Sequence, residues 1–265
     1  MFITFLTDFG LADDFVGTCH GVMKRIAPDA QIIDITHGIG PGRILQGALV
    51  LANTLAYMPK GVHLAVVDPG VGGSRRPLVL EDAEGRFYVG PDNGLLLPAA
   101  DRFGGVAAVH ELANPAYALE RVSRTFHGRD LFSPAAAHLA AGVPIAELGP
   151  PIASEELVRI DVPQVEIDGS QIHATVLAVD RFGNVSLNLA REQLEDAGVV
   201  PGTRVEVVVN DRQYFAVAAR TFADARTGDL ILYEDSYANV AVAVSRGSAA
   251  ELLAAGEGSD LLIRT

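Results

Sequence analysis

Several residue types are scarce in this sequence, and each shortage excludes a class of protein. The 265 residues include one cysteine, Cys19, and no tryptophan. A single cysteine excludes an intrachain disulfide and a thiolate metal cage, and its place in a predicted helix favours a small core residue. No apolar run is long enough to span a membrane, and Asp8 interrupts an N-terminus that lacks a basic leader. We therefore expect a cytoplasmic protein.

Positive charge is also in short supply. Lys and Arg total 20 against 33 Asp and Glu, which leaves a net charge of −13. Such a chain repels phosphate backbones and anionic lipid, so we expect no nucleic acid and no membrane surface as partner. The excess of negative charge favours a cationic small molecule as ligand. Hydrophobic residues make up 49%, enough for a large core, and the length suits two domains.

The first 150 residues alternate between strand and helix patterns. Strands are expected at 2–6, 32–35 and 62–67, with helices at 15–27 and 44–58 between them. This βαβ alternation predicts an α/β domain with a mostly parallel sheet and right-handed crossovers. Further strands are expected at 78–80, 86–89 and 106–110, and a helix that begins near His127 and ends near Ala141.

Gly149, Pro150 and Pro151 mark a domain boundary, and the pattern changes beyond them. Short strands separated by turns are expected at 171–179, 204–209, 213–218, 230–233 and 239–244, with short helices at 191–196 and 248–254. We therefore predict an N-terminal α/β domain over 1–150 and a smaller antiparallel, β-barrel-like domain over 151–265.

The chain is organised around VHLAVVDPGVGGSRR, residues 62–76. A buried strand ends at Asp68, and three glycines and two arginines follow. Open α/β sheets place their sites at such strand ends. A simple Asp-Pro turn with solvated arginines explains the same residues, so the pattern alone leaves both interpretations open.

Other polar residues follow neighbouring strands and are expected near Asp68. They are Asp8, the pair Asp34 and His37, and His127 at the start of a helix. Asp13 and Asp14 fit the N-cap of the helix at 15–27. The familiar zinc, phosphate-loop, nucleophile-elbow and dinucleotide signatures are absent. A metal-dependent phosphoesterase using Asp8, Asp34, His37 and Asp68 and a non-enzymatic nucleoside-binding regulator remain open at this point.

Motifs along nearly the whole chain are those of one family. They are TDFG (7–10) with Asp13, DITH (34–37), VDPGVGGSRR (67–76), FHGRD (126–130), VDRFGNVSLN (179–188) and DSYANVAVAVSRG (235–247). Together they resemble the S-adenosylmethionine hydrolases, also called S-adenosylmethionine hydroxide adenosyltransferases, which are relatives of fluorinase and chlorinase. The resemblance implies an α/β domain, a β-barrel-like domain, and a homotrimer with sites between neighbouring subunits.

The resemblance also implies a catalytic triad of Asp68, Arg75 and His127. Halogenating relatives have a serine where this chain has Gly128, so water is the expected nucleophile and halogenation the alternative. Water would attack C5′ of S-adenosylmethionine, with Asp68 and His127 as the candidate bases and Arg75 orienting Asp68. A metal beside a sulfonium would add repulsion, so neither a metal nor another cofactor is expected.

The resemblance also implies three groups of substrate-binding residues. Asp8 matches the carboxylate that holds both ribose hydroxyls. Residues expected around the methionine part are Asp13, Asp180, Ser236 and Tyr237, and those expected around adenine are Phe182, Asn184, Val244 and Arg246. Tyr237 replaces an arginine of the halogenases, and Gly-Ile-Gly-Pro-Gly after His37 replaces Glu-Ile-Pro-Pro-Gln. These two departures fall where the resemblance implies binding of the ligand carboxylate and the lid over the ligand.

Overall fold

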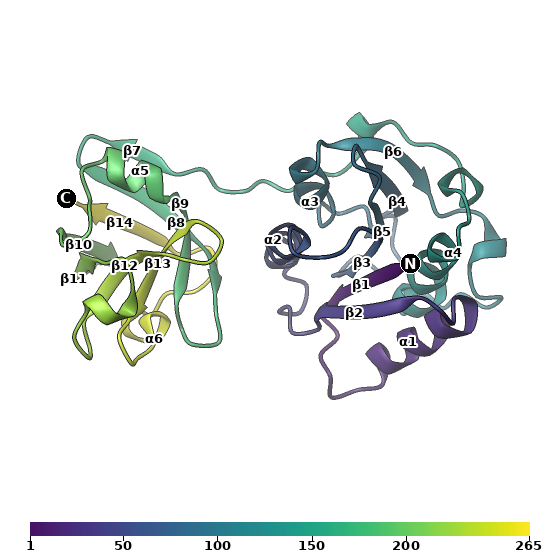
Figure 1. Cartoon of the computed structure of the whole chain (residues 1–265), viewed down its shortest axis with the longest axis horizontal. Coiled ribbons are helices and arrows are strands. Elements are labelled where there is room, and N and C mark those ends of the chain that lie inside the picture. The colour runs from purple at the N-terminus through teal and green to yellow at the C-terminus, as the bar shows by residue number, and fades with distance from the viewer. The chain divides into compact units, whose positions relative to one another are not determined.

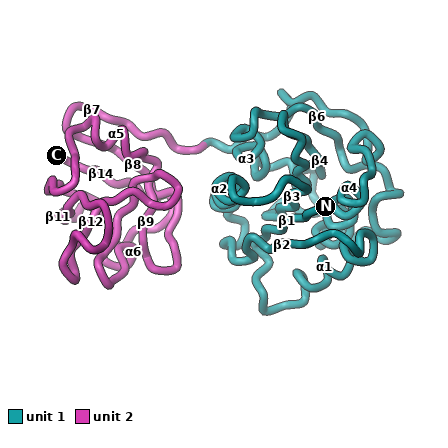
Figure 2. Tube along the Cα trace, viewed as in Figure 1, with its two compact units in different colours: residues 1–161 teal, residues 162–265 magenta.

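A computed structural model describes all 265 residues and divides them into two compact units. Unit 1 is Met1–Asp161 and unit 2 is Val162–Thr265, coloured separately in Figure 2. The division falls between Asp161 and Val162, whereas the Gly-Pro-Pro punctuation suggested a boundary after residue 150. Each unit has its own hydrophobic core.

Unit 1 is built on a six-stranded sheet with strand order β2-β1-β3-β5-β4-β6. Its strands are β1 (Phe2–Thr7), β2 (Gln31–Thr36), β3 (Val62–Val66), β4 (Pro77–Asp82), β5 (Phe87–Pro91) and β6 (Val106–Glu111). β2, β1, β3 and β5 are parallel, and β4 is antiparallel to β5 and β6. The predicted parallel-rich α/β domain is confirmed.

Helices cover both faces of this sheet (Figure 1). They are α1 (Phe15–Ile26), α2 (Ile44–Leu55), α3 (Leu97–Arg102) and α4 (Ser133–Ala140). In β3, Leu64 and Val66 pack with α1 and α4, while Ala65 and the following Val67 pack with α2 and α3. This alternation explains why the strand is apolar at every position: both of its faces are buried.

Two local features differ from the sequence prediction. Asp14 is at the N-cap of α1, but its side chain makes no capping hydrogen bond and instead accepts one from Thr18 Oγ1 at 3.1 Å. The segment Gly128–Phe132 is a π-helix before α4 rather than the first turn of one α-helix. Short helical turns complete the unit at Pro115–Tyr117, Ile145–Glu147 and Ser154–Glu156.

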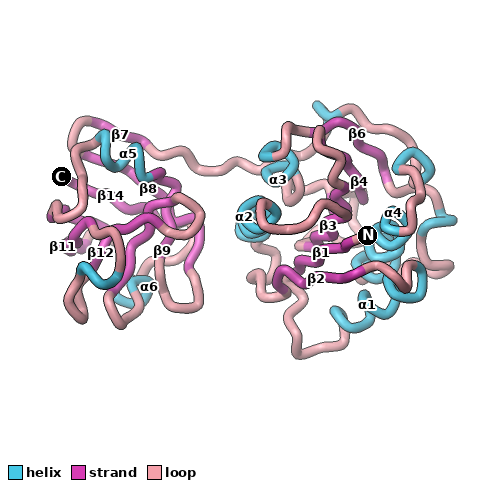
Figure 3. Tube along the Cα trace, viewed as in Figure 1, coloured by secondary structure: helices cyan, strands magenta, loops and turns pink.

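Unit 2 is a closed β-barrel. Its strands, most of them drawn as magenta tubes in Figure 3, are β7 (Glu166–Asp168), β8 (Gln171–Val179), β9 (Val185–Ala190), β10 (Arg204–Val209), β11 (Arg212–Ala218), β12 (Leu230–Glu234), β13 (Asn239–Val244) and β14 (Asp260–Arg264). The order is β14-β10-β11-β12-β13-β9-β8-β7, and pairing of β14 with β8 closes the ring. Closure removes the exposed edges of the strands in the ring, while β7 pairs with β8 alone and lies outside it.

The barrel departs from a purely antiparallel pattern at one place, because β11 and β12 pair in parallel. The helices α5 (Arg191–Asp196) and α6 (Ala249–Leu253) and the turn Phe222–Asp224 lie between strands. Val185, Leu187 and Leu189 alternate inward along β9 and join the barrel core. No helix in either unit is long and apolar enough to cross a membrane.

Candidate active site

Asp68, Arg75 and His127, the predicted triad, lie together in unit 1. Arg75 Nε is 3.0 Å from both oxygens of the Asp68 carboxylate, and Arg75 Nη2 is 2.5 Å from Oδ2. The same Nη2 lies 2.7 Å from His127 Nδ1. Arg75 therefore joins the carboxylate that follows β3 to the imidazole that precedes the π-helix.

The ion pair in this triad is largely shielded from water. The side chain of Asp68 is 5% exposed and that of Arg75 is 10% exposed. The guanidinium also lies over the ring of Phe132, 5.2 Å from its centroid. Charge-assisted bonds that are shielded in this way are stronger and geometrically better fixed than surface pairs. The arrangement holds a carboxylate in one orientation at a strand end.

The glycines after Asp68 allow the loop to fold closely against the segment before His127. Gly72 has a φ of +75°, and a Cβ there would lie 2.2 Å from the carbonyl oxygen of Arg124. Only glycine suits such a conformation at such a distance. The sequence DPGVGG thus does more than end a strand: it lets the Arg75 loop approach residues 123–127.

His127 has one ring nitrogen whose role is fixed by its neighbour. Arginine can only donate, so Nδ1 of His127 accepts from Arg75, and the neutral ring carries its proton on Nε2. Burial lowers the pKa of His127 below its usual value, and the positive charge of Arg75 lowers it further. Asp68, Asp130 and the backbone of Ser123 act in the opposite direction. His127 is neutral near pH 7.

A buried carboxylate, Asp130, organises the segment that carries His127. It is completely buried, and its oxygens accept from Arg129 Nε at 2.6 Å and from the backbone N–H of Ser123 at 2.7 Å. Ser123 Oγ in turn accepts from the N–H of Phe126 at 3.0 Å. The sequence motif FHGRD indicated His127 but not this supporting role of Asp130.

The π-helix places Gly128 in a tight position. The N–H of Ser133 donates to the carbonyl of Gly128, five residues back. A Cβ on Gly128 would lie 2.8 Å from Cζ of Phe9 and 3.4 Å from Cε2 of Phe126. Phe9 and Phe126 also contact each other edge to face, with centroids 5.8 Å apart. A side chain at position 128 therefore requires Phe9 to move.

Asp8 and Asp13 lie in the loop between β1 and α1. Asp8 Oδ2 accepts from the backbone N–H of Gly42 at 2.8 Å, in the Gly-Ile-Gly-Pro-Gly segment after His37. Asp8 is half-buried and Asp13 is exposed. The loop also contacts His37, because the N–H of Gly10 donates to its carbonyl at 2.8 Å.

The three carboxylates that follow strands of unit 1 have separate partners. Asp68 is bonded to Arg75, Asp8 to the Gly42 backbone, and Asp34 to His20 at 2.8 Å. The phosphoesterase hypothesis needs Asp8, Asp34, His37 and Asp68 around one metal centre. Of these four residues, only Asp34 and His37 belong to a group of three possible metal ligands, and its third member is His20.

In unit 2, Asp180, Phe182 and Asn184 form one turn between β8 and β9. Asp180 Oδ1 accepts from the N–H groups of Phe182 and Asn184, at 2.8 and 2.9 Å, and its Oδ2 accepts from Asn184 Nδ2 at 2.7 Å. The ring of Phe182 is left 70% exposed. Asp180 thus shapes the turn that presents an aromatic face and an amide.

Ser236 and Tyr237 lie in the turn between β12 and β13, which Asp235 supports. Asp235 Oδ1 accepts from the N–H of Tyr237 at 2.8 Å, and Oδ2 accepts from Ser186 Oγ on β9 at 2.5 Å. Burial, followed by the charges of Asp180 and Asp235, raises the pKa of Tyr233 to about 12. Asp180 and Asp235 therefore lie near the same ring.

Val244 ends β13, and Arg246 follows it with a φ of 62°. The turn at 180–184 packs close to this segment. Gly183 is in the left-handed region, and a Cβ there would lie 2.1 Å from Ser248 Oγ. The N–H of Ala250 also donates to the carbonyl oxygen of Gly183 at 3.0 Å. The turn that carries Phe182 and Asn184 thus contacts the segment that follows Arg246.

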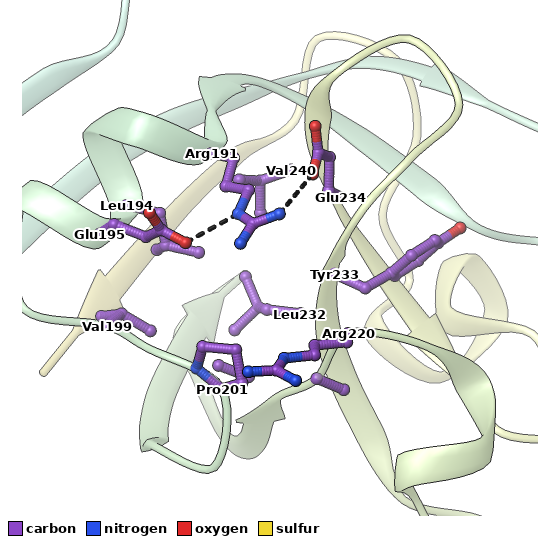
Figure 4. A pocket seen from close by; sticks show the side chains of 12 residues that line it. Arg191, Leu194, Glu195, Val199, Pro201, Arg220, Leu232, Tyr233, Glu234 and Val240 are labelled. Atoms are coloured by element: carbon purple, nitrogen blue, oxygen red, sulfur yellow. Dashed lines mark hydrogen bonds and ion pairs between the residues drawn. The ribbon is translucent and has the colours of Figure 1, made fainter.

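A separate pocket of about 190 Å³ lies elsewhere in unit 2 (Figure 4). Leu194, Leu232 and Val240 supply apolar lining, and Arg191 is held by Glu195 and Glu234 at 2.7 and 2.9 Å. None of the predicted substrate residues lines it. Two carboxylates therefore neutralise Arg191, and Arg220 is the second cation among the lining residues.

Comparison with known proteins decides between the families that such a site allows. A model described as the SAM hydroxide adenosyltransferase N-terminal domain matches residues 3–149, and one described as the C-terminal domain matches residues 174–262. The chain belongs to the SAM hydroxide adenosyltransferase family. The resemblance stated from the motifs is confirmed.

Relatives of this chain are named either hydrolases or fluorinases. A protein of Salinispora arenicola named (R)-S-adenosyl-L-methionine hydrolase is 49% identical, over 98% of this chain and 97% of its own. A Thermus thermophilus protein of the same name is 39% identical, over 97% and 96%. A fluorinase of Actinopolyspora mzabensis is 30% identical, over 94% and 92%. The hydrolases are thus the nearer of these relatives.

A solved structure has a similar fold. An uncharacterised conserved protein of Thermotoga maritima is 36% identical and superposes with a TM-score of 0.92, over 99% of this chain and all of its own. The Thermotoga chain therefore has the same fold as this one over nearly the whole length.

Proposed function

We propose that this protein is a hydrolase that cleaves S-adenosyl-L-methionine into adenosine and L-methionine. The observation that carries the proposal is the bonded array of Asp68, Arg75 and His127 at the end of β3. Relatives at 39–49% identity over nearly the full chain bear the name of this hydrolase, with the R configuration at sulfur. The array is suited to holding and activating one water molecule.

The reaction needs a base but no acid. Water attacks C5′ of the ribose, the C5′–S bond breaks, and its electron pair goes to sulfur. The sulfonium becomes the neutral thioether of methionine, so the leaving group takes up no proton. One proton leaves the attacking water. The protein's task is to orient the water in line with the bond and to accept that proton.

The structure supports a division of labour within the triad. Nδ1 of His127 is occupied by Arg75, and the neutral ring carries its proton on Nε2, so the ring can donate but not accept there. We therefore assign proton acceptance to Asp68 and make His127 a neutral partner that holds Arg75. Arg75 orients the carboxylate and stabilises negative charge on the attacking oxygen. No metal is required in this scheme.

Substrate binding is assigned to residues of both units. Asp8 would accept from the two ribose hydroxyls, and Phe182 would stack on adenine. Asn184 uses Nδ2 to bond Asp180, which leaves its amide oxygen to accept from the adenine amino group. Val244 and Arg246 would border the base. Asp13, Asp180, Ser236 and Tyr237 would surround the methionine part, with the Asp180 oxygens already engaged by its own turn.

The second candidate is halogenation, because fluorinases are among the relatives. Gly128 argues against it. The resemblance implies a serine at this position in halogenating relatives, and a Cβ on Gly128 would lie 2.8 Å from Cζ of Phe9. The chain thus lacks the hydroxyl and has filled its space with an aromatic ring.

A product assay without added metal tests the proposed function. The purified chain is incubated with S-adenosyl-L-methionine, with and without chloride or fluoride, and nucleosides are separated by chromatography. We expect adenosine and L-methionine in equal amounts. Accumulation of 5′-chloro- or 5′-fluoro-5′-deoxyadenosine would favour the halogenase, whereas an unchanged substrate would favour a nucleoside-binding regulator.

We further propose a cytoplasmic homotrimer whose sites form between the α/β unit of one subunit and the barrel of the next. The proposed ligand residues are divided between the units, and Leu11, Phe15, Phe182 and Tyr237 leave large apolar side chains exposed. The lone buried thiol of Cys19 suits a reducing compartment. Analytical ultracentrifugation at the assay concentration tests the assembly, and a fully active monomer would contradict it.

A further inference from the structure

Two histidines and one carboxylate meet in unit 1, outside the triad. His20 Nε2 on α1 lies 2.8 Å from Oδ1 of Asp34 on β2, and His37 Nε2 lies 3.2 Å from the same oxygen. The three ligand atoms all lie within 4.8 Å of one another. They come from a helix, a strand and the residue just after that strand, so the fold itself brings them together.

His37 contributes a buried nitrogen without a hydrogen bond. The residue is 5% exposed, and its Nε2 is buried with no partner of hydrogen-bonding geometry, although Asp34 is near. Its other nitrogen, Nδ1, is 2.8 Å from Thr7 Oγ1, which also accepts from the N–H of Phe9 at 3.1 Å. A metal-binding histidine is typically held by a hydrogen bond at the ring nitrogen that does not bind the metal, as Nδ1 of His37 is held at Thr7.

The rings are also held in place by packing. Phe5 on β1 contacts both imidazoles, with centroids 4.8 Å from His37 and 5.9 Å from His20. Both imidazoles are therefore preoriented at the positions from which they would bind an ion.

We propose that His20, Asp34 and His37 form a binding site for one divalent transition-metal ion of the zinc class. Zn–N and Zn–O bonds of about 2.0–2.1 Å in a tetrahedron separate ligand atoms by roughly 3.3 Å. The two separations to Asp34 Oδ1, 2.8 and 3.2 Å, already approach that value. Mg²⁺ and Ca²⁺ are disfavoured because two of the three ligands are imidazoles.

The fourth coordination position would face solvent. The side chains of His20 and Asp34 are 33% and 41% exposed, whereas His37 lies beneath them. A bound ion would tie α1 to the end of β2. It would also brace the loop that carries Asp8, because Thr7 and Gly10 both contact His37. None of the three ligands belongs to the triad, so a bound ion has no part in the water activation assigned to Asp68.

Metal titration of the untagged chain tests the site. The protein is stripped with a chelator, dialysed, and titrated with Zn²⁺ by calorimetry, and bound metal is counted by elemental analysis. Co²⁺ provides a second readout through the absorption spectrum of tetrahedral coordination. We expect one Zn²⁺ per chain, a tetrahedral Co²⁺ spectrum, and a higher unfolding temperature with Zn²⁺, but no such rise with Mg²⁺.

Two variants and a control make the test specific. H20Q and D34N alter partly exposed positions that tolerate polar side chains, and circular dichroism checks their folding. Loss of a residue that only hydrogen-bonds to a metal ligand already weakens metal binding by about tenfold to a hundredfold. Each of these variants removes a ligand itself and should therefore weaken Zn²⁺ binding by more than that. H173Q, on the exposed face of β8, should bind as the parent does. Equal binding by H20Q and H173Q, or no stoichiometric binding by the parent, would overturn the proposal.

Discussion

Arg75 donates to Nδ1 of His127 across 2.7 Å while its other contacts hold Asp68. Protonation of His127 would place an N–H opposite that guanidinium and break the contact. Both the burial of the ring and the charge of Arg75 lower the pKa of His127. The neutral ring is therefore the functional form, and this has a consequence for the pH dependence of the reaction.

The rate should be flat near neutral pH and fall on the acid side. The pKa of His127 is lowered from 6.5, so the loss should begin only as the pH falls below 6.5. Initial rates between pH 4 and 9, at saturating substrate, measure this fall in rate, the acid limb of the pH profile. H127N has no imidazole to protonate, so the part of the acid limb that is due to His127 should disappear. An acid limb with its midpoint above pH 6.5 in the parent would contradict the prediction.

Replacing Asp68 by asparagine should lower turnover without abolishing nucleoside binding. An asparagine side chain keeps the shape of the aspartate but cannot accept the water's proton, and positioned proton transfer contributes roughly 10²–10⁴-fold. Initial rates give the loss, and calorimetry with adenosine shows whether binding is retained. If D68N keeps nearly the full rate, Asp68 is structural and another group is the base.

Asp8→Asn should have the opposite effect. The Asp8 carboxylate is proposed to accept from both ribose hydroxyls, and charge-assisted hydrogen bonds contribute about 1.5–3 kcal/mol each. Adenosine binding should weaken by about tenfold or more, while D68N binds adenosine as the parent does. The Gly42 contact can persist, because the amide oxygen of asparagine still accepts from that N–H. Unchanged adenosine affinity in D8N would exclude this role.

Gly128→Ser should destabilise unit 1 and should not create a halogenase. Its Cβ would lie 2.8 Å from Cζ of Phe9, and Phe9 is itself packed against Phe126. Overpacking of this kind costs about 1–3 kcal/mol. Urea denaturation measures the loss, and G17A on α1, where a Cβ meets nothing within 4 Å, is the matched control. A stable G128S protein that forms halogenated nucleoside would refute the argument from Phe9.

Asp130→Asn should slow the reaction through His127 rather than through the substrate. The buried carboxylate holds Arg129 and the Ser123 N–H, and so fixes residues 123–127. Because Asp130 touches neither the triad nor the proposed ligand residues directly, kcat should fall while KM stays nearly constant. The acid limb of the rate should also shift, since the charge of Asp130 acts on His127. A purely structural role would leave the limb unmoved.

Much of the fold could be predicted because its signals are local. The β-branched run at 62–67 and the Pro and Gly residues around it defined β3, and the helices 15–27 and 44–58 follow apolar spacing. β14 was missed because Asp260–Arg264 is short and pairs with strands far away in sequence. β9 was missed although Val185, Leu187 and Leu189 alternate with polar or small residues. The parallel pairing of β11 with β12 has no local signal.

The site was predictable only in part. The motif residues Asp68, Arg75 and His127 could be named, but not the direction of the Arg75–His127 hydrogen bond, which depends on three-dimensional placement. The π-helix at Gly128–Phe132 was likewise unpredicted, because it depends on a bond from Ser133 to a carbonyl five residues back. Asp130 and Asp235 act through backbone N–H groups, and their sequence neighbours gave no sign of this.

Isotope incorporation tests the central claim most directly. The reaction is run in water enriched in oxygen-18, and adenosine and methionine are analysed by mass spectrometry. Attack of water at C5′ predicts adenosine with one heavy oxygen, in proportion to the enrichment, and methionine without any label. Unlabelled adenosine, or label found in the methionine-derived product instead, would contradict hydrolysis at C5′.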